Sequence, residues 1–555
     1  MTEKTPPRVP ALEKAVRQKS SETPTGPTAA SAGGPWRRFV APALAGAVAA
    51  GVSMAVAELI AGVVSGAPSL ILAIGALVID LQPPGAKDVV VSLFGTNDKL
   101  ALNVFIVLVA LVIAAAVGIA ASRDLGRATW AFGAFGLVAL VAALREPLIA
   151  PVLSVVTTVV AVAAGLWALR VMLELLGTGP GMAVTPGAAL STPGARPAMP
   201  DWDRRSFLVR SGALAGGAIV AGGVGRLLLD RRALTLPPAV ALPRPAVTVA
   251  PLTPAQSLPV PGITPIVVPN NDFYRIDTAL LPPHVDAAGW SMKVSGMVDH
   301  PLTLTYPDLT TMPLFEQYIT IQCVSNEVGG DLVGNAKWTG VHLRDVLAAA
   351  GVQAGATQLV GRSVDGFTAG FPTAHAMDPA RDPMIALAMN DEPLPVIHGY
   401  PARLVIPGLY GYVSATKWLA AIEMTTLEGF DGYWIPLGWS KLGPILTQSR
   451  IDVPRNRQSL KAGPVTIAGV AWAPDRGISK VEVSVDQGSW LTCTLSGPIS
   501  KAVWVQWQVP WTATPGAHTI EVRATDATGA VQTPDVTPPA PDGARGHHTI
   551  SVSVS

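Results

Sequence analysis

Three short runs in the middle of the chain carry the side chains best suited to chemistry. Cys323 ends an alternating, strand-like run and is followed by a break at 324–326. His398 and Arg403 lie in a tight turn with Gly and Pro, and Ser414–Lys417 adds two hydroxyl groups and an ammonium group. Arginine, lysine and backbone amides at glycine-rich turns bind phosphate, and a thiolate binds a soft, heavy metal. Together the three runs predict a metal cofactor that carries a phosphate.

The elements that must position these side chains are short. Between 266 and 444 the sequence mixes alternating strands (Met292–Val298, Tyr318–Cys323) with a helix at His342–Ala350 and many Gly and Pro turns, which predicts an α+β domain. From 445 to 555 the pattern is all-β and favours an immunoglobulin-like sandwich. Its predicted strands are Val465–Gly469, Lys480–Asp486, Ala502–Val509, Thr519–Ala524 and Ile550–Val554.

The composition of the 555 residues excludes several classes of protein. Apolar residues make up 49% and charged residues 14%, which rules out a wholly soluble and a wholly disordered chain. A net charge of +1 gives no field that favours nucleic acid as a partner. Two cysteines are too few for a disulfide-dense scaffold or a four-thiolate zinc site, and Cys493 is expected to be a core thiol.

The apolar residues are concentrated in the first half of the chain, where 39–176 is predicted to be a transmembrane region. Four runs are long enough to cross a bilayer as helices. They lie at about 39–64, 100–121, 128–145 and 148–172. A further run at 67–81 is short and is followed by Pro83 and Pro84, so we expect that it does not cross.

Positive charge predicts the orientation of these spans. The polar, basic tail 1–38 is expected to be disordered and cytoplasmic. After a linker at 177–203, the run 204–230 begins with Arg204-Arg205 and resembles a twin-arginine export signal, whose arginines also start in the cytoplasm. An even number of spans, four, must therefore lie between the two. Alternatively, Arg204-Arg205 is only the positively charged flank of a stop-transfer segment. The predicted topology is the same under this interpretation.

The signal-like run shows no small-residue cleavage site, so we expect an uncleaved fifth helix that tethers the rest outside the cytoplasm of a multi-pass plasma-membrane protein. The proline-rich stretch 231–265 predicts a stiff spacer that lifts the next domain off the membrane. A twin-arginine route exports folded cargo, which suits a protein loaded with a cofactor. No histidine precedes His284, so a bis-histidine haem within the bundle is excluded and no haem is expected in this chain.

Taken together, the motifs of 266–555 resemble a known family. The middle unit resembles the sulfite-oxidase-type molybdopterin oxidoreductases, and the last unit is similar to the immunoglobulin-like dimerisation domain that follows it there. The resemblance rests on the runs 270–275 (Asn-Asn-Asp-Phe-Tyr-Arg), 320–326 (Thr-Ile-Gln-Cys-Val-Ser-Asn), 335–341, 398–407, 416–418 and 478–490.

This resemblance implies a molybdenum–molybdopterin cofactor with Cys323 as the thiolate ligand of the metal. The residues implied to hold the pterin and its phosphate are Asn271, Tyr274, Arg275, His398, Arg403, Ser414, Ala415, Thr416 and Lys417, with Asp365 and Thr368 as further pterin contacts. The family's chemistry is two-electron oxygen-atom transfer on a small-molecule substrate. The resemblance also implies a homodimer through the C-terminal domain and a separate electron carrier, either a cytochrome or a quinone-linked protein.

Departures from the family pattern bear on the substrate. Sulfite oxidases have an arginine where this chain has Glu327, and an active-site tyrosine where counting back from Met389-Asn390 gives Leu387. A carboxylate in a pocket meant for a dianion repels sulfite, which argues against strict sulfite oxidase activity. His398 matches sulfite oxidases, whereas the periplasmic methionine-sulfoxide reductases of the family have Asn there.

Three functions therefore stay open. The first is a membrane-anchored, extracytoplasmic molybdenum oxidoreductase acting on a small, sulfur-containing substrate, and the second is reductive repair of sulfoxides. The third is a non-catalytic surface scaffold whose β-sandwich binds a partner.

Overall fold

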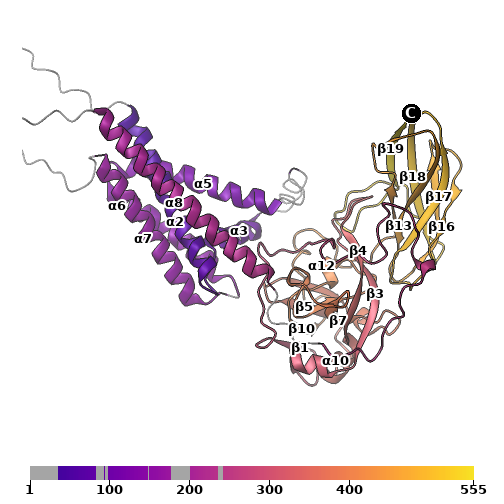
Figure 1. The fold of residues 1–555 in the computed structure, drawn as a ribbon. Helices are drawn as coiled ribbons and strands as arrows, with labels where there is room; N and C mark the ends of the chain where they lie inside the picture. Colours follow the sequence, from indigo (N-terminus) through magenta and orange to yellow (C-terminus); the bar gives the residue numbers. More distant parts are fainter. Residues whose placement is uncertain (1–34, 83–92, 94–97, 148, 177–199, 236–241) are drawn as a thin grey trace, which may run out of the picture. The chain divides into compact units, whose positions relative to one another are not determined.

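The structure is a computed structural model that describes residues 35–82, 93, 98–147, 149–176, 200–235 and 242–555 (Figure 1). Most of the predicted tail (1–34) and linker (177–199) lies outside the described residues. The last residues of that tail are already helical in η1 (Trp36–Val40). The chain divides into two compact units, one of 1–56, 107–137 and 159–221, and one of 57–106, 138–158 and 222–555.

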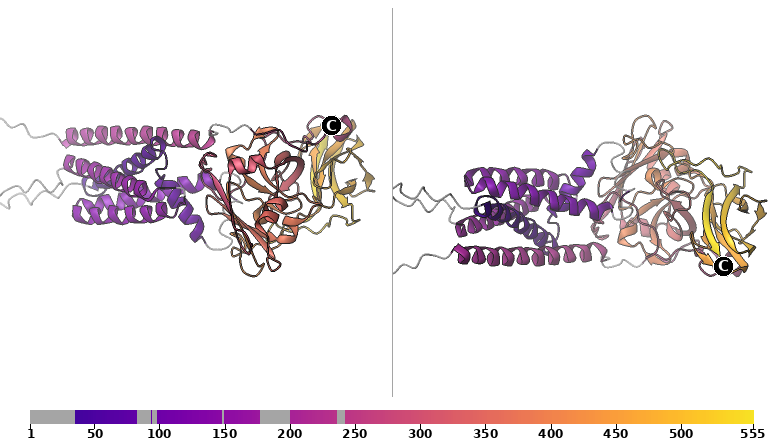
Figure 2. Two further views of the ribbon diagram at one scale, coloured as in Figure 1. Left: turned by 90° about the horizontal axis from the view of Figure 1, so that it is seen from below. Right: turned by 90° about the horizontal axis from the view of Figure 1, so that it is seen from above.

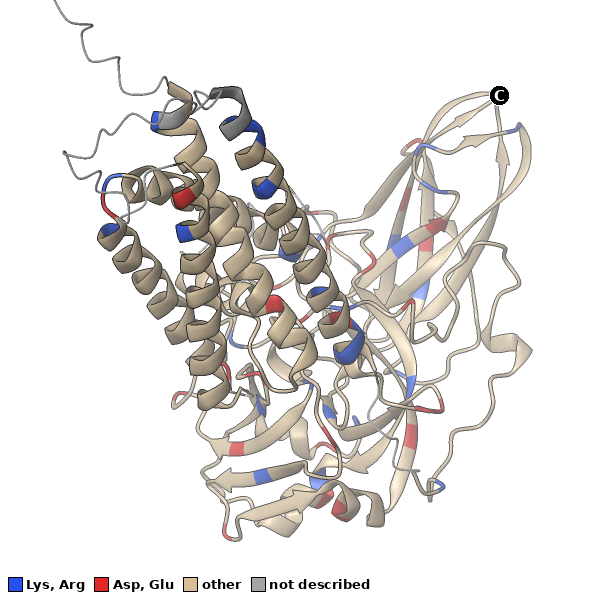
Figure 3. Ribbon diagram, turned by 60° about the vertical axis from the view of Figure 1, so that its left-hand side comes forward, with Lys and Arg blue, Asp and Glu red and all other residues tan. Residues whose placement is uncertain are grey.

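The first half of the chain is helical, as predicted. Its helices are α2 (Ala41–Val63), α3 (Leu70–Leu81), α5 (Asp98–Ala121), α6 (Leu125–Leu144), α7 (Pro151–Leu175) and α8 (Pro200–Leu234). Among the described residues, five helices are long and apolar enough to cross a bilayer, whereas α3 has only 12 residues. Figure 3 shows that these helices are mainly uncharged along their length. The predicted helices are confirmed, and their crossing of a membrane stays a prediction.

The α+β domain contains two five-stranded sheets. The first has the order β2 (Leu302–Thr305), β1 (Ser291–Gly296), β10 (Leu419–Thr425), β5 (Gln358–Ser363), β6 (Thr368–Pro372), and only β1 and β10 in it run parallel. The second has the order β3 (Leu314–Gln322), β4 (Val333–His342), β7 (Met384–Met389), β8 (Glu392–Pro393), with β9 (Arg403–Val405) also paired to β7. Short helices connect the strands: α9 (Tyr306–Thr311), α10 (Leu343–Ala350), α11 (Thr373–Met377), η4 (Val396–His398) and α12 (Gly411–Ser414).

In α10 and β3, the buried positions match the apolar patterns from which the sequence predicts a helix and a strand. In α10 the buried residues Leu343, Val346, Leu347 and Ala350 recur at helical spacing, and Gly351 ends the helix at a φ of +67°. In β3 the residues from Tyr318 to Gln322 are all buried, because both faces of the strand are covered. Both elements confirm the prediction to within a few residues.

The last 110 or so residues form a two-layer β-sandwich, as predicted (Figure 2). One sheet has the order β11 (Gln448–Val453), β13 (Gly463–Trp472), β17 (Val505–Ala513), β16 (Thr494–Leu495). The other has the order β12 (Ser459–Leu460), β19 (His548–Val554), β18 (Gly516–Asp526), β14 (Ile478–Val485), β15 (Leu491–Thr492). Cys493 lies in the sandwich core without a disulfide, and burial raises the pKa of its thiol to about 12, which confirms a core thiol.

The proline-rich stretch does not behave as a free-standing spacer, and that part of the prediction is wrong for residues 242–265. The amide of Ala246 donates to the carbonyl of Leu314 (2.8 Å), and the amide of Leu258 donates to Gln506 Oε1 (2.7 Å). An extended, proline-rich backbone keeps its remaining amides available, and the edge strand β3 offers partners for them. The stretch is therefore bound along both the α+β domain and the sandwich.

A buried amide cluster joins the α+β domain to the sandwich directly before Cys323. Gln322 Nε2 donates to Gln448 Oε1 (2.9 Å), while Trp472 Nε1 donates to Gln322 Oε1 (2.7 Å). Gln448 in turn donates to the carbonyl of Ala544 (2.9 Å). Gln322 and Gln448 are buried, so each hydrogen bond replaces one that water would otherwise make.

Replacement of Gln322 by leucine is expected to lower stability by about 2–4 kcal/mol, because it leaves the indole N–H of Trp472 and the side-chain carbonyl oxygen of Gln448 buried without a partner. Thermal unfolding of the full-length protein in detergent measures the effect. Lys461→Gln, an exposed change in the same sandwich, is the control and should leave the melting temperature unchanged. An unchanged melting temperature for Gln322→Leu would contradict the structural role of the cluster.

Candidate active site

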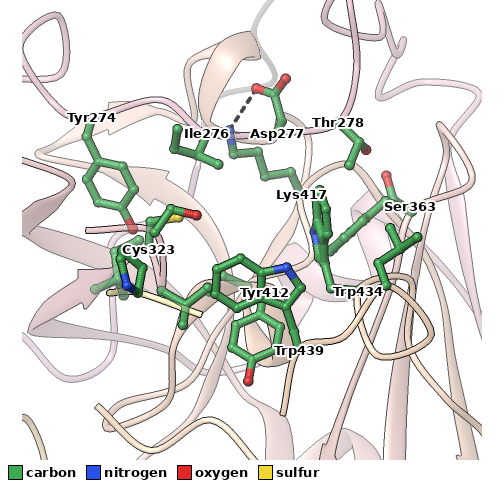
Figure 4. Close-up of a pocket in the computed structure, with 18 of the residues that line it drawn as sticks. Tyr274, Ile276, Asp277, Thr278, Cys323, Ser363, Tyr412, Lys417, Trp434 and Trp439 are labelled. Atoms are coloured by element: carbon green, nitrogen blue, oxygen red, sulfur yellow. Dashed lines mark hydrogen bonds and ion pairs between the residues drawn. The ribbon is translucent and has the colours of Figure 1, made fainter. Parts of the chain in front are cut away.

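A cavity of about 550 Å³ lies in the α+β domain and brings together residues from distant parts of the sequence (Figure 4). The site residues implied by the sequence that line it are Tyr274, Cys323, Asp365, Arg403, Ala415 and Lys417. They come from the loop before β1, the end of β3, the β5–β6 turn, β9 and the turn after α12. The cavity is therefore the one place where the implied thiolate ligand and two implied phosphate-binding cations meet.

Cys323 directly follows β3, and the loop after it folds back on itself. The amide of Cys323 donates to the carbonyl of Leu332 (2.9 Å), and Asn326 Oδ1 accepts from the amide of Leu332 (2.8 Å). Asn326 and Cys323 are both buried. This closed loop fixes the direction in which the Cys323 side chain leaves the strand.

Arg403 is a buried cation. Its Nη1 donates to the carbonyl of His398 (3.0 Å), and its guanidinium carbon lies 5.1 Å from the ring centroid of Trp338. Burial lowers its pKa to about 10. The turn at Gly399 brings Arg403 and Lys417 together: a Cβ there would lie 3.1 Å from Arg403 Cβ and 3.0 Å from Lys417 Cβ, at a φ of +115° that favours glycine.

His398 supports the site without lining the cavity. Its Nε2 donates to the carbonyl of Asn270 (3.0 Å), and Phe273 packs against the imidazole edge to face at 5.5 Å. Burial, with a further contribution from Lys417, lowers its pKa to about 3, so the ring is neutral at pH 7. A neutral ring with its proton on Nε2 anchors the loop that carries Tyr274.

Asp277 stands at the centre of three cations and was not singled out from the sequence. Its carboxylate accepts from Lys417 Nζ (3.1 Å), Arg275 Nε (2.9 Å) and Lys99 Nζ (2.8 Å). Burial alone would raise the pKa of Asp277, but Lys417, Lys99 and Arg275 hold it well below its usual range. Conversely, burial lowers the pKa of Lys417 to about 8, although Asp277 works against that shift. The position of Asp277, two residues after Arg275, is the signal that could have identified it.

Several residues implied by the family lie close to the cavity without lining it. Asn271 is exposed in the loop before β1, and Arg275 is turned to Asp277. Ser414 is buried and donates to the carbonyl of Tyr410 (2.9 Å), and Thr368 is in β6. Their roles in binding a cofactor stay predictions.

The cavity also contains residues that the sequence did not indicate. Tyr412, Trp434 and Trp439 contribute aromatic rings, and 538–540 reach the cavity from the sandwich. Glu327 lines the cavity, whereas Leu387 is fully buried in β7 and does not. No local pattern marks the tryptophans, because they belong to an irregular loop between β10 and β11 that is placed only by tertiary packing.

The cation pair suits an anionic group. Arg403 is 2% exposed, and within the described residues its guanidinium hydrogen-bonds only to backbone carbonyls. Thr416 Oγ1, beside Lys417, is buried without a hydrogen-bond partner in the described part of the chain. A buried cation without a counter-charge costs several kcal/mol. These residues therefore fit a phosphate-bearing ligand, and Cys323, a side chain of the type that binds a soft metal, lines the same cavity.

Comparison with known proteins agrees with this chemistry. Residues 279–434 match the family model of the oxidoreductase molybdopterin binding domain, and 444–538 match that of the Mo-co oxidoreductase dimerisation domain. A protein of Bacillus subtilis described as an uncharacterized oxidoreductase, YuiH, is 34% identical over 181 residues, which are 32% of this chain and 87% of that protein. The chain belongs to the sulfite-oxidase-type molybdopterin oxidoreductases. As a member of this family it is an oxidoreductase, and molybdenum–molybdopterin is its implied cofactor.

Human mitochondrial sulfite oxidase is 30% identical over 288 residues, which are 44% of this chain and 52% of that protein. The chain therefore spans about half the length of the sulfite oxidase that it matches. Among solved structures, the sulfane dehydrogenase SoxCD from Paracoccus pantotrophus aligns with this chain at 23% identity and a TM-score of 0.46. The alignment covers 54% of this chain and 85% of that chain. The match to the dimerisation domain supports a homodimer of this molybdopterin oxidoreductase.

Buried neutral His398 predicts acid sensitivity. Its pKa is lower in the folded chain than the value of about 6.5 in the unfolded chain, so its stabilising contribution is complete above pH 6.5 and is lost as pH falls toward 3. Between pH 7 and pH 5, the free energy of unfolding should fall by about 2 kcal/mol less in His398→Gln than in the wild type, because the variant has no imidazole to protonate. Urea unfolding of the full-length protein at both pH values measures this. Parallel pH profiles for the two proteins would contradict a neutral buried His398.

Loss of the charge on Asp277 should destabilise the site. Asp277→Asn leaves Lys417, Arg275 and Lys99 facing one another, and removal of one partner of a buried ion pair costs about 3–5 kcal/mol. The free energy of unfolding at pH 7 is the measurement. Asp286→Asn, at an exposed position ahead of β1, serves as the control and should cost less than about 0.5 kcal/mol.

Proposed function

We propose that this protein is a membrane-anchored, extracytoplasmic molybdenum–molybdopterin oxidoreductase that transfers one oxygen atom to or from a small, sulfur-containing substrate. The observation that carries the proposal is that one cavity is lined by a single cysteine and by two buried cations, Arg403 and Lys417. A thiolate and an anion-binding pair in one cavity suit a cofactor that carries both a metal and a phosphate.

When bound, the cofactor supplies a metal centre that exchanges an oxygen atom and two electrons with a substrate lone pair. The chain holds it: Cys323 binds the metal, Arg403 and Lys417 bind the phosphate, and His398 fixes the loop of Tyr274. In the reductive direction a sulfoxide takes up two electrons and two protons and gives a thioether and water. The electrons come from a separate one-electron carrier, a cytochrome or a quinone-linked protein, and they return to it in the oxidative direction.

Reductive repair of sulfoxides is the second candidate, and the position of Glu327 favours it. Glu327 lines the cavity where sulfite oxidases have an arginine, and Leu387 gives the cavity no tyrosine hydroxyl. A carboxylate repels sulfite, whereas a sulfoxide is neutral at its reacting group. The third alternative, a non-catalytic scaffold, includes no anionic ligand that would neutralise the buried charge of Arg403.

The proposed location rests on the five long apolar helices and on the Arg204-Arg205 pair at the start of the last one. With the basic ends in the cytoplasm, the bilayer holds these helices, and the molybdopterin domain lies on the other side of the plasma membrane. Export by a twin-arginine route would carry this domain across already folded around its cofactor.

Metal analysis of Cys323→Ala is the decisive test. Full-length protein matured with its cofactor should contain close to one molybdenum and one pterin per chain, and Cys323→Ala should lose at least nine-tenths of the metal. Cys493→Ala is the matched control, because Cys493 lies in the sandwich core and should retain both. A well-folded wild type without molybdenum would overturn the proposal and favour the scaffold.

The direction of the reaction is tested on the same preparation. If sulfoxide reduction is the activity, a reduced viologen dye is consumed when a sulfoxide is added, and sulfite leaves the optical absorption spectrum of the oxidised metal centre unchanged. Reduction of the metal by sulfite without consumption of dye would favour the oxidative reaction instead.

A further inference from the structure

The same cavity has a wall of aromatic rings. The ring centroids of Trp434 and Trp439 are 6.5 Å apart at 77°, and those of Tyr412 and Trp439 are 5.9 Å apart at 50°. All three side chains line the cavity that contains Cys323 and are drawn there in Figure 4. Trp439 is therefore packed at a steep angle against both of the other rings, and together the three form one aromatic wall of the cavity.

Hydrogen bonds hold this aromatic wall in place. The hydroxyl of Tyr412 donates to the carbonyl of Ser440 (2.5 Å), and the amide of Ser440 donates to the carbonyl of Pro541 (3.0 Å). Tyr433 packs against Trp434 edge to face at 5.1 Å, and its amide donates to the carbonyl of Thr368 (3.1 Å). The wall is therefore formed before any ligand binds, which lowers the entropy cost of binding to it.

Charged side chains line the same cavity: the acids are Asp277, Asp365 and Glu327, and the bases are Arg403 and Lys417. Arg403 and Lys417 are the cations of the lining and are the residues that fit the cofactor phosphate. Glu327 is exposed to the cavity, and within the described residues its carboxylate makes no hydrogen bond or ion pair. Once a cofactor phosphate bound the cations, Glu327 would remain as an exposed negative charge in the same cavity as Tyr412, Trp434 and Trp439.

We propose that this pocket selects a cationic organic substrate: a sulfoxide or thioether that also carries an alkylated ammonium group. The ammonium group would lie against the rings of Tyr412 and Trp439, with Glu327 as its counter-charge, and the sulfur of the substrate would face the metal held by Cys323. Ring faces and a carboxylate together are the chemistry that recognises quaternary ammonium groups. This inference rests on the proposed function and adds the substrate class.

An isosteric pair of ligands tests the charge alone. 2-(Methylsulfinyl)ethyl-trimethylammonium and 3,3-dimethylbutyl methyl sulfoxide have the same shape and differ by one positive charge. Dissociation constants from quenching of tryptophan fluorescence, measured on the full-length, cofactor-loaded protein in detergent, give a readout independent of turnover. We expect the cationic ligand to bind at least 10-fold more tightly than its neutral isostere, and the anion 3-(methylsulfinyl)propionate to bind more weakly than both.

Variants then assign the preference to residues. Glu327→Gln should reduce the preference for the cation to less than 3-fold, while Glu428→Gln, an exposed acid outside the cavity, should leave it unchanged. Trp439→Leu should weaken the cationic ligand at least 5-fold, and Trp439→Phe, which keeps a ring, should recover part of that loss. Trp490→Leu in the sandwich is the matched tryptophan control. KM for the cationic substrate should rise in Glu327→Gln and Trp439→Leu in step with the dissociation constants, and should stay at the wild-type value in Glu428→Gln and Trp490→Leu.

The outcomes separate the two proposals. A protein that contains molybdenum and pterin but binds both members of the isosteric pair equally overturns the cationic substrate class and leaves the proposed function intact. A preference that survives Glu327→Gln and Trp439→Leu also overturns it, because the preference would then arise elsewhere. A wild type without molybdenum overturns the proposed function itself.

Discussion

The charge of Arg403 is the constraint around which the site is built. A guanidinium that is 2% exposed and has only backbone carbonyls as hydrogen-bond partners among the described residues is stable only if something else supplies negative charge or polarisable surface. Trp338 supplies part of this through its ring face, and the carbonyl of His398 supplies more. The remainder is what the phosphate of the proposed cofactor would contribute, and cofactor binding would then be linked to the folding of this region.

For Lys417, the other buried cation, the negative charge comes from the carboxylate of Asp277. It neutralises a buried ammonium group with a carboxylate that Arg275 and Lys99 also share, so one acid serves three bases. A net positive charge remains around the acid after this sharing. The cluster thus keeps Lys417 charged despite burial and still attracts a phosphate, whereas a one-to-one pair would cancel the charge.

The sequence predicts well what depends on local pattern. The alternation in β3, the helical spacing in α10 and the strands of the sandwich are confirmed, and Cys323, Arg403 and Lys417 do line one cavity. What it does not predict depends on contacts between distant segments. Asp277 gains its role only when α5 and the turn after α12 bring Lys99 and Lys417 to it, and 538–540 reach the cavity only because the sandwich packs beside it. The spacer prediction failed for the same reason: proline content predicts an extended backbone but not the edge strand that binds it.

Burial separates the two kinds of charge that line the cavity. Arg403 and Lys417 are buried, where their charge is costly until an anion binds, whereas Glu327 is exposed, where water solvates its carboxylate. In the proposed enzyme the cofactor phosphate would neutralise the two cations, and Glu327 would then repel a dianionic substrate. The same carboxylate, with the rings of Tyr412 and Trp439 in the same cavity, would attract a cation. One domain would thus retain an anionic cofactor and still discriminate against anionic substrates, because the cations are neutralised by the cofactor and the exposed acid is not.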